Sequence, residues 1–412
     1  MTIAPFVVAA ALAAGTAQAE IVREVRIHGN VYLTDAEVLA VAGVEVGDAI
    51  TAESVPAIEK RLRDSGRFET VQVRKRYRSL ADPTDVAIVL VVHEKPGVVS
   101  ATSSTAPVFT PWRRLRSRLM FLPILNYGDG YGFTYGARLA FKDTIGDRSR
   151  VSVPMTWGGE RRIGLEAERS FDGPISIVRG GVGLYRRVNP FFDLSDRRTE
   201  ARAEADRIFT SWFRAGVDAR VAQVEFGPDY EARHSAAGFH TVFDTRIDPS
   251  FPRNAIHTRI GWERLFFGES AGRWDTDARG YVGVGGSLVL ALRAQLIRSD
   301  SSLPFAEQSL FGGSGTVRGY ATGHRAGDNL FAASAELRIP LNSPLTFGRF
   351  GLKTFVDAGT AWNTGSRWDD EPLDRGIGGG VYIGGGPFII DLDIAKPRRG
   401  DVRAHFGMGV TF

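Results

Sequence analysis

From about residue 118 to the end of the chain, hydrophobic and polar residues alternate. The final segment, DVRAHFGMGVTF, shows this most clearly, because its even positions from Val402 to Phe412 are all apolar and its odd positions are polar or small. Successive side chains of a strand point to opposite faces, so this segment would have one apolar and one polar face. The pattern predicts strands that lie between lipid and a wet interior.

The segment DRRTEARAEADRIF places five charged residues on one face of such a strand: Arg198, Glu200, Arg202, Glu204 and Asp206. At helical spacing these charges would surround the segment, so a period of two is favoured over a helix. The solvent-facing side of a soluble sheet and a helix remain alternatives for this segment taken alone. Inside a barrel, the row would form a lumenal line of mutually neutralising charges.

Segments of this kind recur and can be counted. We place strands near 118–127, 130–142, 147–158, 159–172, 174–188, 196–210, 212–226, 233–247, 254–267, 273–286, 287–299, 329–341, 351–362, 375–384, 386–396 and 401–412. Sixteen is an even number, as bacterial outer-membrane barrels require. An unpaired edge in hydrocarbon costs several kcal/mol per backbone group, so the last strand is expected to pair with the first. The predicted fold is a membrane all-β, 16-stranded antiparallel transmembrane β-barrel.

Residues 20–96 have a different pattern, which predicts a small α+β domain of order β-α-α-β-β. IVREVRIHGN alternates as a strand, and TDAEVLAVAG opens with Thr34 and Glu37, the spacing of a capping box. Val55, Ile58 and Leu62 lie at helical spacing in the following segment. TVQVRKRYR and DVAIVLVVHEKP supply two more strands rich in β-branched residues.

Composition adds the compartment and the domain limits. The first nineteen residues are largely apolar and end in Ala-Gln-Ala, which predicts a signal peptide. The domains expected are therefore a signal peptide (1–19), the small α+β domain (20–96), a Ser/Thr/Pro-rich linker (97–117) and the barrel (118–412). The chain has no cysteine, 48 glycines and a net charge of +4, which is too small and dispersed to indicate nucleic-acid binding.

A search for catalytic chemistry finds no site. The seven histidines show no His-x-x-x-His spacing, and GGSG and GIGGG lack the strand-to-helix context and the lysine of a phosphate loop. GVGGS does not have the form of a nucleophile elbow. We predict no catalytic residues, no metal, no cofactor and no enzymatic activity.

The alternation is interrupted by FGGSGTVRGYATGHRAGD, residues 311–328. Together with the other motifs, this segment resembles the Omp85 superfamily (BamA/TamA type). The small domain, with GN after its first strand, SGRF after its second helix and VVHEKP at its end, looks like a single POTRA domain. VRGY matches the motif of the family's sixth outer loop, TFVDAG matches a motif on strand thirteen, and DTRIDPSFPRNAIHTRIGW resembles a mid-barrel stretch.

The resemblance implies a site made of Val317, Arg318, Gly319, Tyr320 and Asp357. In the family, the sixth loop folds back into the lumen and its arginine pairs with the strand-thirteen aspartate. The residues also support this pairing directly, because alternation turns Asp357 inward and a planar guanidinium suits an inward carboxylate. We expect the pair to lock the loop for stability. The alternative is a flexible surface loop with a solvated arginine.

The end of the chain resembles the signal by which barrel proteins are recognised for assembly, with Phe406, Val410 and Phe412 as its apolar residues. The family mechanism also implies a weak seam between the first and last strands. Pro123 in the first strand and Gly407 in the last predict poor bonding there.

The resemblance implies a bacterial outer-membrane protein that assists the insertion and assembly of outer-membrane proteins or the translocation of polypeptides. Its expected partners are the lipid bilayer, unfolded outer-membrane or secreted polypeptide clients, and a periplasmic or inner-membrane protein held by the POTRA-like domain. That domain could take a client on the edge left by the strands around 70–78 and 85–94, or it could be a plain spacer. A passive channel or structural barrel is one alternative function. A two-partner secretion transporter is another, disfavoured because such proteins usually carry two POTRA domains and a plug helix.

Overall fold

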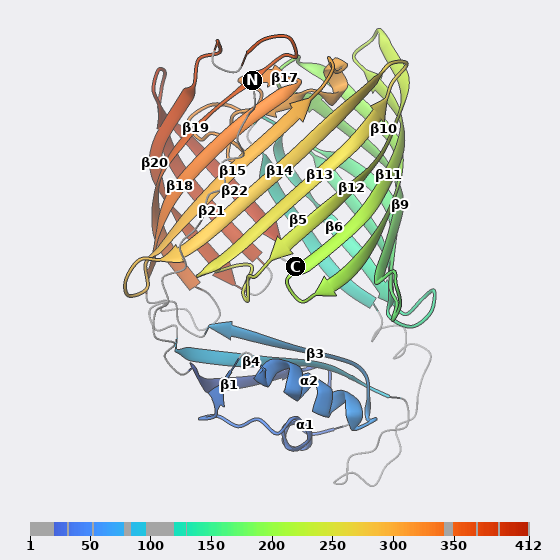
Figure 1. The fold of residues 1–412 in the computed structure, drawn as a ribbon, viewed down its shortest axis with the longest axis vertical. Helices are drawn as coiled ribbons and strands as arrows, with labels where there is room; N and C mark the ends of the chain where they lie inside the picture. Colours follow the sequence, from blue (N-terminus) through green and yellow to red (C-terminus); the bar gives the residue numbers. More distant parts are fainter. Residues whose placement is uncertain are drawn as a thin grey trace. The chain divides into compact units, whose positions relative to one another are not determined.

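The computed structural model describes residues 20–30, 33–51, 53–77, 84–95, 119–128, 130–341, 349–367, 370–385 and 388–410. The chain divides into two compact units between Ala106 and Pro107, which are a small α+β unit and a β-barrel (Figure 1). The expected signal peptide and the linker at 97–117 lie outside the described residues. Within the described ranges, no helix has both the length and the apolar character needed to cross a bilayer.

The N-terminal unit has the predicted β-α-α-β-β order plus a two-residue strand between the helices. Its sheet runs β2-β1-β4-β3, with β1 parallel to β4. Of the two late strands expected to leave an exposed edge, β4 lies between β1 and β3, and the long edge strand is β3. The elements are β1 (Glu20–His28), α1 (Asp35–Ala42), β2 (Ala49–Ile50), α2 (Ser54–Asp64), β3 (Phe68–Tyr77) and β4 (Asp85–Glu94).

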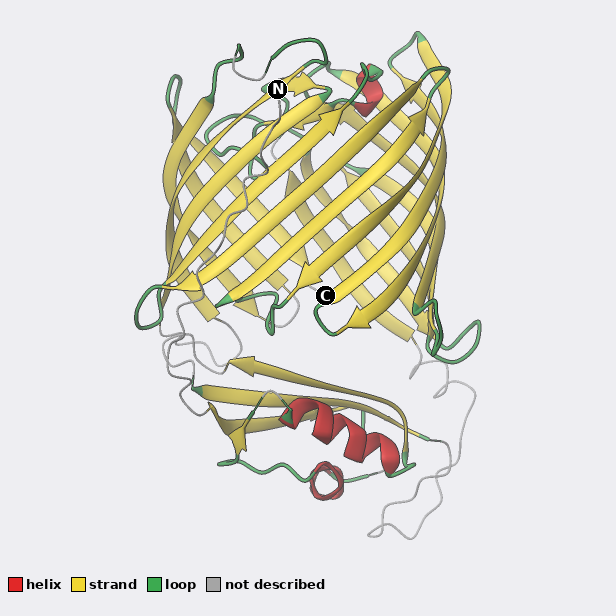
Figure 2. Ribbon diagram, in the orientation of Figure 1, coloured by secondary structure: helices red, strands yellow, loops and turns green. Residues whose placement is uncertain are grey.

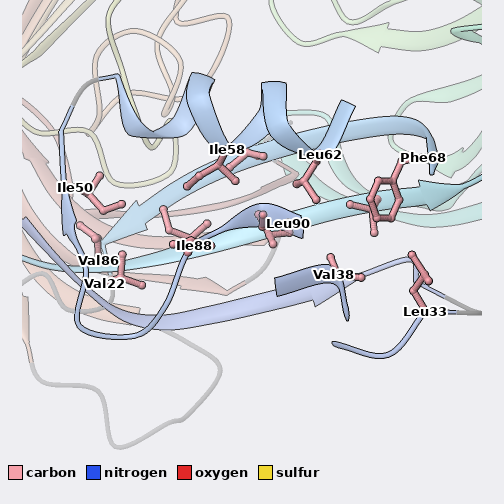
Figure 3. Close-up of a cluster of buried hydrophobic side chains, with 14 residues drawn as sticks. Val22, Leu33, Val38, Ile50, Ile58, Leu62, Phe68, Val86, Ile88 and Leu90 are labelled. Atoms are coloured by element: carbon pink, nitrogen blue, oxygen red, sulfur yellow. The ribbon is translucent and has the colours of Figure 1, made fainter. Parts of the chain in front are cut away.

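The helices of this unit begin where their sequences predict. Thr34 caps α1 with the reciprocal bonds of a capping box to Glu37, and Gly43 ends the helix in the left-handed conformation at φ 60°. In Figure 3, Ile58 and Leu62 of α2 point onto the sheet, where they pack with Leu90 in one continuous buried cluster. This cluster gives the unit a hydrophobic core of its own.

The C-terminal unit is a single sheet of sixteen strands, as predicted, with each strand antiparallel to its neighbour (Figure 2). Each predicted strand has one counterpart in the structure, and their ends differ by a few residues at most. The strands are β5 (Leu119–Gly128), β6 (Gly132–Lys142), β7 (Ser149–Gly158), β8 (Arg161–Ser170), β9 (Ile177–Asn189), β10 (Leu194–Thr210), β11 (Phe213–Phe226), β12 (Tyr230–Asp244), β13 (Ala255–Phe266), β14 (Ser270–Gly283), β15 (Val289–Ser299), β18 (Asn329–Leu341), β19 (Arg349–Trp362), β20 (Asp374–Gly385), β21 (Phe388–Pro397) and β22 (Arg403–Val410).

The two faces of the wall divide as the alternation predicts. Val182 and Leu184 of β9 are more than half exposed on the outer surface. Arg179, on the inner face of the same strand, is bonded to Glu204 and Asp206 of β10. The lumenal row of charges on β10 is therefore confirmed, and the apolar outer surface is suited to lipid.

The join between the first and last strands differs from the expectation of full pairing. Among the described residues, no ladder connects β5 to β22, although the Tyr127 and Phe406 rings meet across the join at 5.9 Å between centroids. Pro123 of β5 has no N–H to donate to a ladder. The argument from hydrocarbon applies to edges that face only lipid, whereas β5 also borders a cavity on the lumenal side. We call this unpaired join the seam.

The connector between β15 and β18, residues 300–328, packs inside the barrel. It contains a short helix, η1 (Phe305–Glu307), and a hairpin of β16 (Ser309–Phe311) and β17 (Arg325–Gly327). Three of its residues, Phe311, Val317 and Tyr320, form a buried cluster with Leu330 of β18 and Ala361 of β19. The connector is thus held against the inner wall by apolar contacts as well as by charges.

Candidate functional site

The structure brings Arg318 of the connector and Asp357 of β19 together. The Arg318 Nε donates to Asp357 Oδ2 at 2.8 Å, and its Nη2 donates to Oδ1 at 2.9 Å. The Arg318 backbone N–H donates to Oδ2 at 3.0 Å. Only 7% of Arg318 and 3% of Asp357 is exposed. The pair therefore has the two-pronged geometry in which a guanidinium binds a carboxylate most strongly.

Arg318 also contacts β18 and β21, the strands that flank the pair β19 and β20. Its Nη1 donates to Glu336 of β18 at 2.7 Å and to Asp393 of β21 at 3.1 Å. Its Nη2 donates to the hydroxyl of Ser334 at 3.1 Å, and the guanidinium lies 3.3 Å from the centroid of the Phe355 ring. We call Arg318, Asp357, Glu336, Asp393, Ser334 and Phe355 the Arg318 cluster.

Further cations balance the acidic residues of the cluster. Lys353 Nζ lies 2.6 Å from Asp391 and 3.0 Å from Asp393. Arg338 Nε donates to Glu336 at 2.8 Å. A buried carboxylate is tolerated when its charge and lone pairs are satisfied. Each acidic residue here has a cationic partner, and without Arg318 the network would hold four carboxylates and two cations.

A stripe of glycines on β20 makes room for this network. A Cβ on Gly376 would lie 1.9 Å from the carbonyl oxygen of Arg318, and one on Gly378 would lie 2.7 Å from the Phe355 ring. A Cβ on Gly380 would lie 2.1 Å from the Asp393 carboxylate. These three residues are the alternate positions of RGIGGG. In the sequence, this site is marked by a glycine at every second position of one strand, which leaves the lumenal face of that strand without side chains where the loop packs.

The other motif residues secure the loop around Arg318. Val317 is fully buried in the apolar cluster described above. Gly319 adopts φ +98°, which a residue with a Cβ rarely does, and its N–H donates to His405 Nε2 on β22 at 2.8 Å. The Tyr320 hydroxyl donates to the carbonyl oxygen of Arg375 at 3.3 Å. The motif therefore reaches the last strand of the barrel as well as its middle.

The predicted C-terminal signal is only partly described. Phe406 is half-buried and contacts Tyr127 across the seam. The side chain of Val410 and the whole of Phe412 lie outside the described residues.

A second anchor of the connector was not expected from the sequence. Glu307 of η1 is 6% exposed and lies among basic residues of the opposite wall. Arg220 Nη2 donates to Glu307 Oε2 at 2.8 Å, Arg198 Nη1 donates to Oε1 at 3.2 Å, and His234 Nδ1 lies 2.9 Å from Oε1. Burial alone would raise the pKa of the Glu307 carboxyl, but the hydrogen bond with His234 and the charges of Arg220 and Arg198 hold it well below its usual range.

The sequence offered a weak signal for this anchor. Arg198 was placed on the lumenal face of its strand, but its partner lies 109 residues later in an irregular segment. Alternation assigns residues to faces of strands and says nothing about which connector residue meets them. Glu307 could therefore be found only from the folded connector.

Replacing Glu307 with glutamine is expected to lower the free energy of unfolding by about 1–3 kcal/mol. The loss of stability is limited because each arginine retains another acidic partner: Arg198 stays paired with Asp196, and both Arg220 and Arg273 stay paired with Glu263. A lowered pKa in the folded state stabilises the fold above the unfolded pKa, so this contribution should disappear as the pH falls into the acid range. Urea unfolding of both proteins at neutral and acid pH measures this, and an equal difference at both would contradict it.

One group of described residues has ligand atoms close enough for a metal. One such atom from each of Glu204, Asp206 and His240 lies within 4.8 Å of the others. Arg179 donates to both carboxylates at 2.8 Å, and His240 Nε2 lies 3.0 Å from Asp206. The carboxylates thus have cationic and imidazole partners from the protein itself, and this cluster is explained as an ion-paired part of the lumenal wall.

Comparisons with known proteins match both units. The model of the Omp85 superfamily domain matches residues 193–412, and the POTRA model, described as a surface antigen variable number repeat, matches residues 20–95. A comparison with curated proteins found no match.

Solved structures share the fold of the chain. BamA from Haemophilus ducreyi lacking POTRA domains 1–3 aligns with a TM-score of 0.62 and 16% identity, over 95% of this chain and 84% of that one. CdiB from Escherichia coli aligns with a TM-score of 0.53 and 13% identity, over 99% and 94% of the two chains. CdiB from Acinetobacter baumannii aligns with the same score and identity, over 96% and 74%. At these identities the likeness establishes the fold alone.

Proposed function

The chain belongs to the Omp85 superfamily, and we propose that it assists the insertion and assembly of outer-membrane proteins or the translocation of polypeptides. It is an outer-membrane β-barrel protein with one POTRA domain in the periplasm. In the proposed mechanism, the POTRA domain captures an unfolded client and the seam of the barrel opens sideways to template or release a client strand. This function involves no covalent chemistry.

The observation that carries the proposal is the seam. Every other pair of neighbouring strands in the barrel is joined by a described ladder, whereas none is described between β5 and β22. Separating two strands costs the hydrogen bonds between them, so the barrel should open first where these are fewest. The ring contact of Tyr127 and Phe406 is a small barrier compared with a full ladder.

The POTRA domain supports the capture step. Its strand β3 forms the long edge of the sheet, and among the described residues β4 is its one neighbouring strand. An edge strand presents free backbone groups to which an extended peptide can add as a further strand. One basic residue of β3, Lys75, already pairs with Glu20 of β1, whose carboxylate lies 2.5 Å from its Nζ, so the backbone edge rather than this charge would bind the client. We propose that clients, or a periplasmic or inner-membrane partner, bind along this edge.

We propose that the Arg318 cluster has a structural role in this mechanism. It joins the connector to β18, β19 and β21, and Gly319 joins the same connector to β22. These bonds hold the strands on one side of the seam as a unit. If β5 and β22 part, the cluster would keep the last strands of the barrel in place.

Locking the seam tests the proposed function. The chain has no cysteine, so a Tyr127→Cys/Phe406→Cys pair can be bridged selectively across the seam. In liposomes, the reduced protein is expected to accelerate the folding of an unrelated barrel client. Bridging the pair should remove this acceleration, because β5 and β22 could no longer separate. Ion conductance is measured on the same preparation.

A second cysteine pair provides the matched control. Phe121→Cys/Leu139→Cys joins β5 to β6, two strands that already share a ladder in which these residues are direct partners. Bridging this pair should leave client folding unchanged. Steady conductance without any acceleration of client folding would show a passive channel and would overturn the proposal.

A further inference from the structure

A cavity of about 690 Å³ lies on the lumenal side of the wall formed by β5 to β10. Its lining includes seven arginines but only three carboxylates. In the network around Arg318, by contrast, three cations face four carboxylates. The volume is in the range of sites that hold small molecules. This part of the lumen therefore combines space with an excess of positive charge.

Three arginines of the cavity lining bind the same carboxylate. Glu166 of β8 receives Arg202 Nη2 at 2.8 Å and Arg138 Nη2 at 3.3 Å, and Arg162 donates to it as well. Three guanidiniums share one acidic residue, which leaves two positive charges uncompensated within this group. The Nε of Arg162 is also buried without a hydrogen-bond partner among the described residues. Guanidiniums arranged in this way suit a phosphate, whose oxygens accept several such bonds.

The opposite border of the cavity is apolar. Phe121 on β5 is 62% exposed on the outer surface, so Leu122 and Ile124 occupy the inner face, where most strands of this barrel carry polar residues. Five consecutive residues of β5, from Leu122 to Asn126, line the cavity. Since successive residues of a strand point to opposite faces, the cavity must reach the backbone of β5, which is one border of the seam.

We infer that this cavity binds a phosphate-bearing lipid, with its phosphate on Arg138, Arg162 and Arg202 and an acyl chain along Leu122 and Ile124 towards the seam. An acyl chain in this position would be buried against apolar side chains, away from the water of the lumen. The phosphate would neutralise the surplus positive charge of the arginines around Glu166. The unpaired seam offers a route between the bilayer and the cavity.

The test is lipid binding to the full chain in a nonionic detergent, measured by native mass spectrometry. Dioctanoyl phosphatidylglycerol is expected to bind more tightly than dioctanoyl phosphatidylcholine, whose choline cation compensates its phosphate. Arg202→Gln, at a half-exposed side chain, should weaken phosphatidylglycerol binding roughly tenfold, as the loss of one charge-assisted hydrogen bond implies. Arg279→Gln on β14 is the matched control and should change nothing, because that guanidinium belongs to another wall and pairs with Asp277.

Two further variants separate a binding site from a structural ion pair. Glu166→Gln removes the competing carboxylate and should strengthen phosphatidylglycerol binding, whereas a merely structural role predicts no gain. Leu122→Asn should weaken the binding of phosphatidylglycerol. It should leave the affinity for glycerol 3-phosphate, measured by competition, unchanged, because that molecule has no acyl chain. Equal binding of both lipids, unaffected by Arg202→Gln, would overturn the inference. Binding of inorganic phosphate as tight as that of phosphatidylglycerol would overturn the lipid as ligand and assign the site to a free anion.

Discussion

Replacing Arg318 with alanine is expected to lower the free energy of unfolding of the barrel by about 3–5 kcal/mol, the usual cost of removing one partner from a buried ion pair. Asp357 would keep the hydroxyl of Ser334 but lose both guanidinium bonds. Glu336 and Asp393 would lose their shared cation. Four buried or half-buried carboxylates, counting Asp391, would then face only Lys353 and Arg338.

The measurement is urea unfolding of the folded chain in phospholipid vesicles, followed by tryptophan fluorescence and by gel mobility with and without heating. Arg318→Lys should fall between the wild type and alanine, because lysine restores the charge without the planar fork. Arg325→Ala provides a matched control on the same connector. That arginine pairs with Asp374 at 2.8 Å in a more exposed setting, so its loss should cost less than about 1 kcal/mol. An Arg318→Ala barrel as stable as the Arg325→Ala barrel would refute a structural role for the cluster.

The fold could be predicted from the sequence because a membrane barrel follows one local rule along its length. Lipid on one side and water on the other impose a period of two on each strand, and this period is visible without knowledge of distant contacts. The same rule turned Asp357 inward. It also placed Arg198 and Asp206 in the lumen, where the structure has them in ion pairs with Asp196 and Arg179.

The rest of the site depends on contacts that no local pattern records. Glu336 and Asp393 also lie on inner faces, but alternation gives a face and not a partner, so nothing singled them out from other lumenal acids. The pairing of β5 with β22 was expected from the cost of an open edge in hydrocarbon. That argument assumed lipid on every side and could not include the lumenal cavity that β5 borders. Glu307 depended on the folding of a connector that has no period.

Replacing Gly376 with alanine is expected to destabilise the barrel by about 3 kcal/mol or more, at the upper end of the usual cost of overpacking. The new Cβ would lie 1.9 Å from the carbonyl oxygen of Arg318. A backbone atom cannot rotate away as a side chain can, so either β20 or the tip of the connector must shift. Because the backbone N–H of Arg318 and its guanidinium both bind Asp357, a shift of the tip would also disturb that pair.

Gly280→Ala on β14 is the matched control for this substitution. A Cβ at Gly280 would meet no atom within 4 Å, so alanine there should be neutral or slightly stabilising through the unfolded chain. The double variant Gly376→Ala/Arg318→Ala distinguishes the two sources of the loss. If the methyl group acts mainly by displacing Arg318, the double variant should be only slightly less stable than Arg318→Ala alone. Full additivity of the two losses would show that Gly376 serves only the packing of β20 and not the placement of the loop.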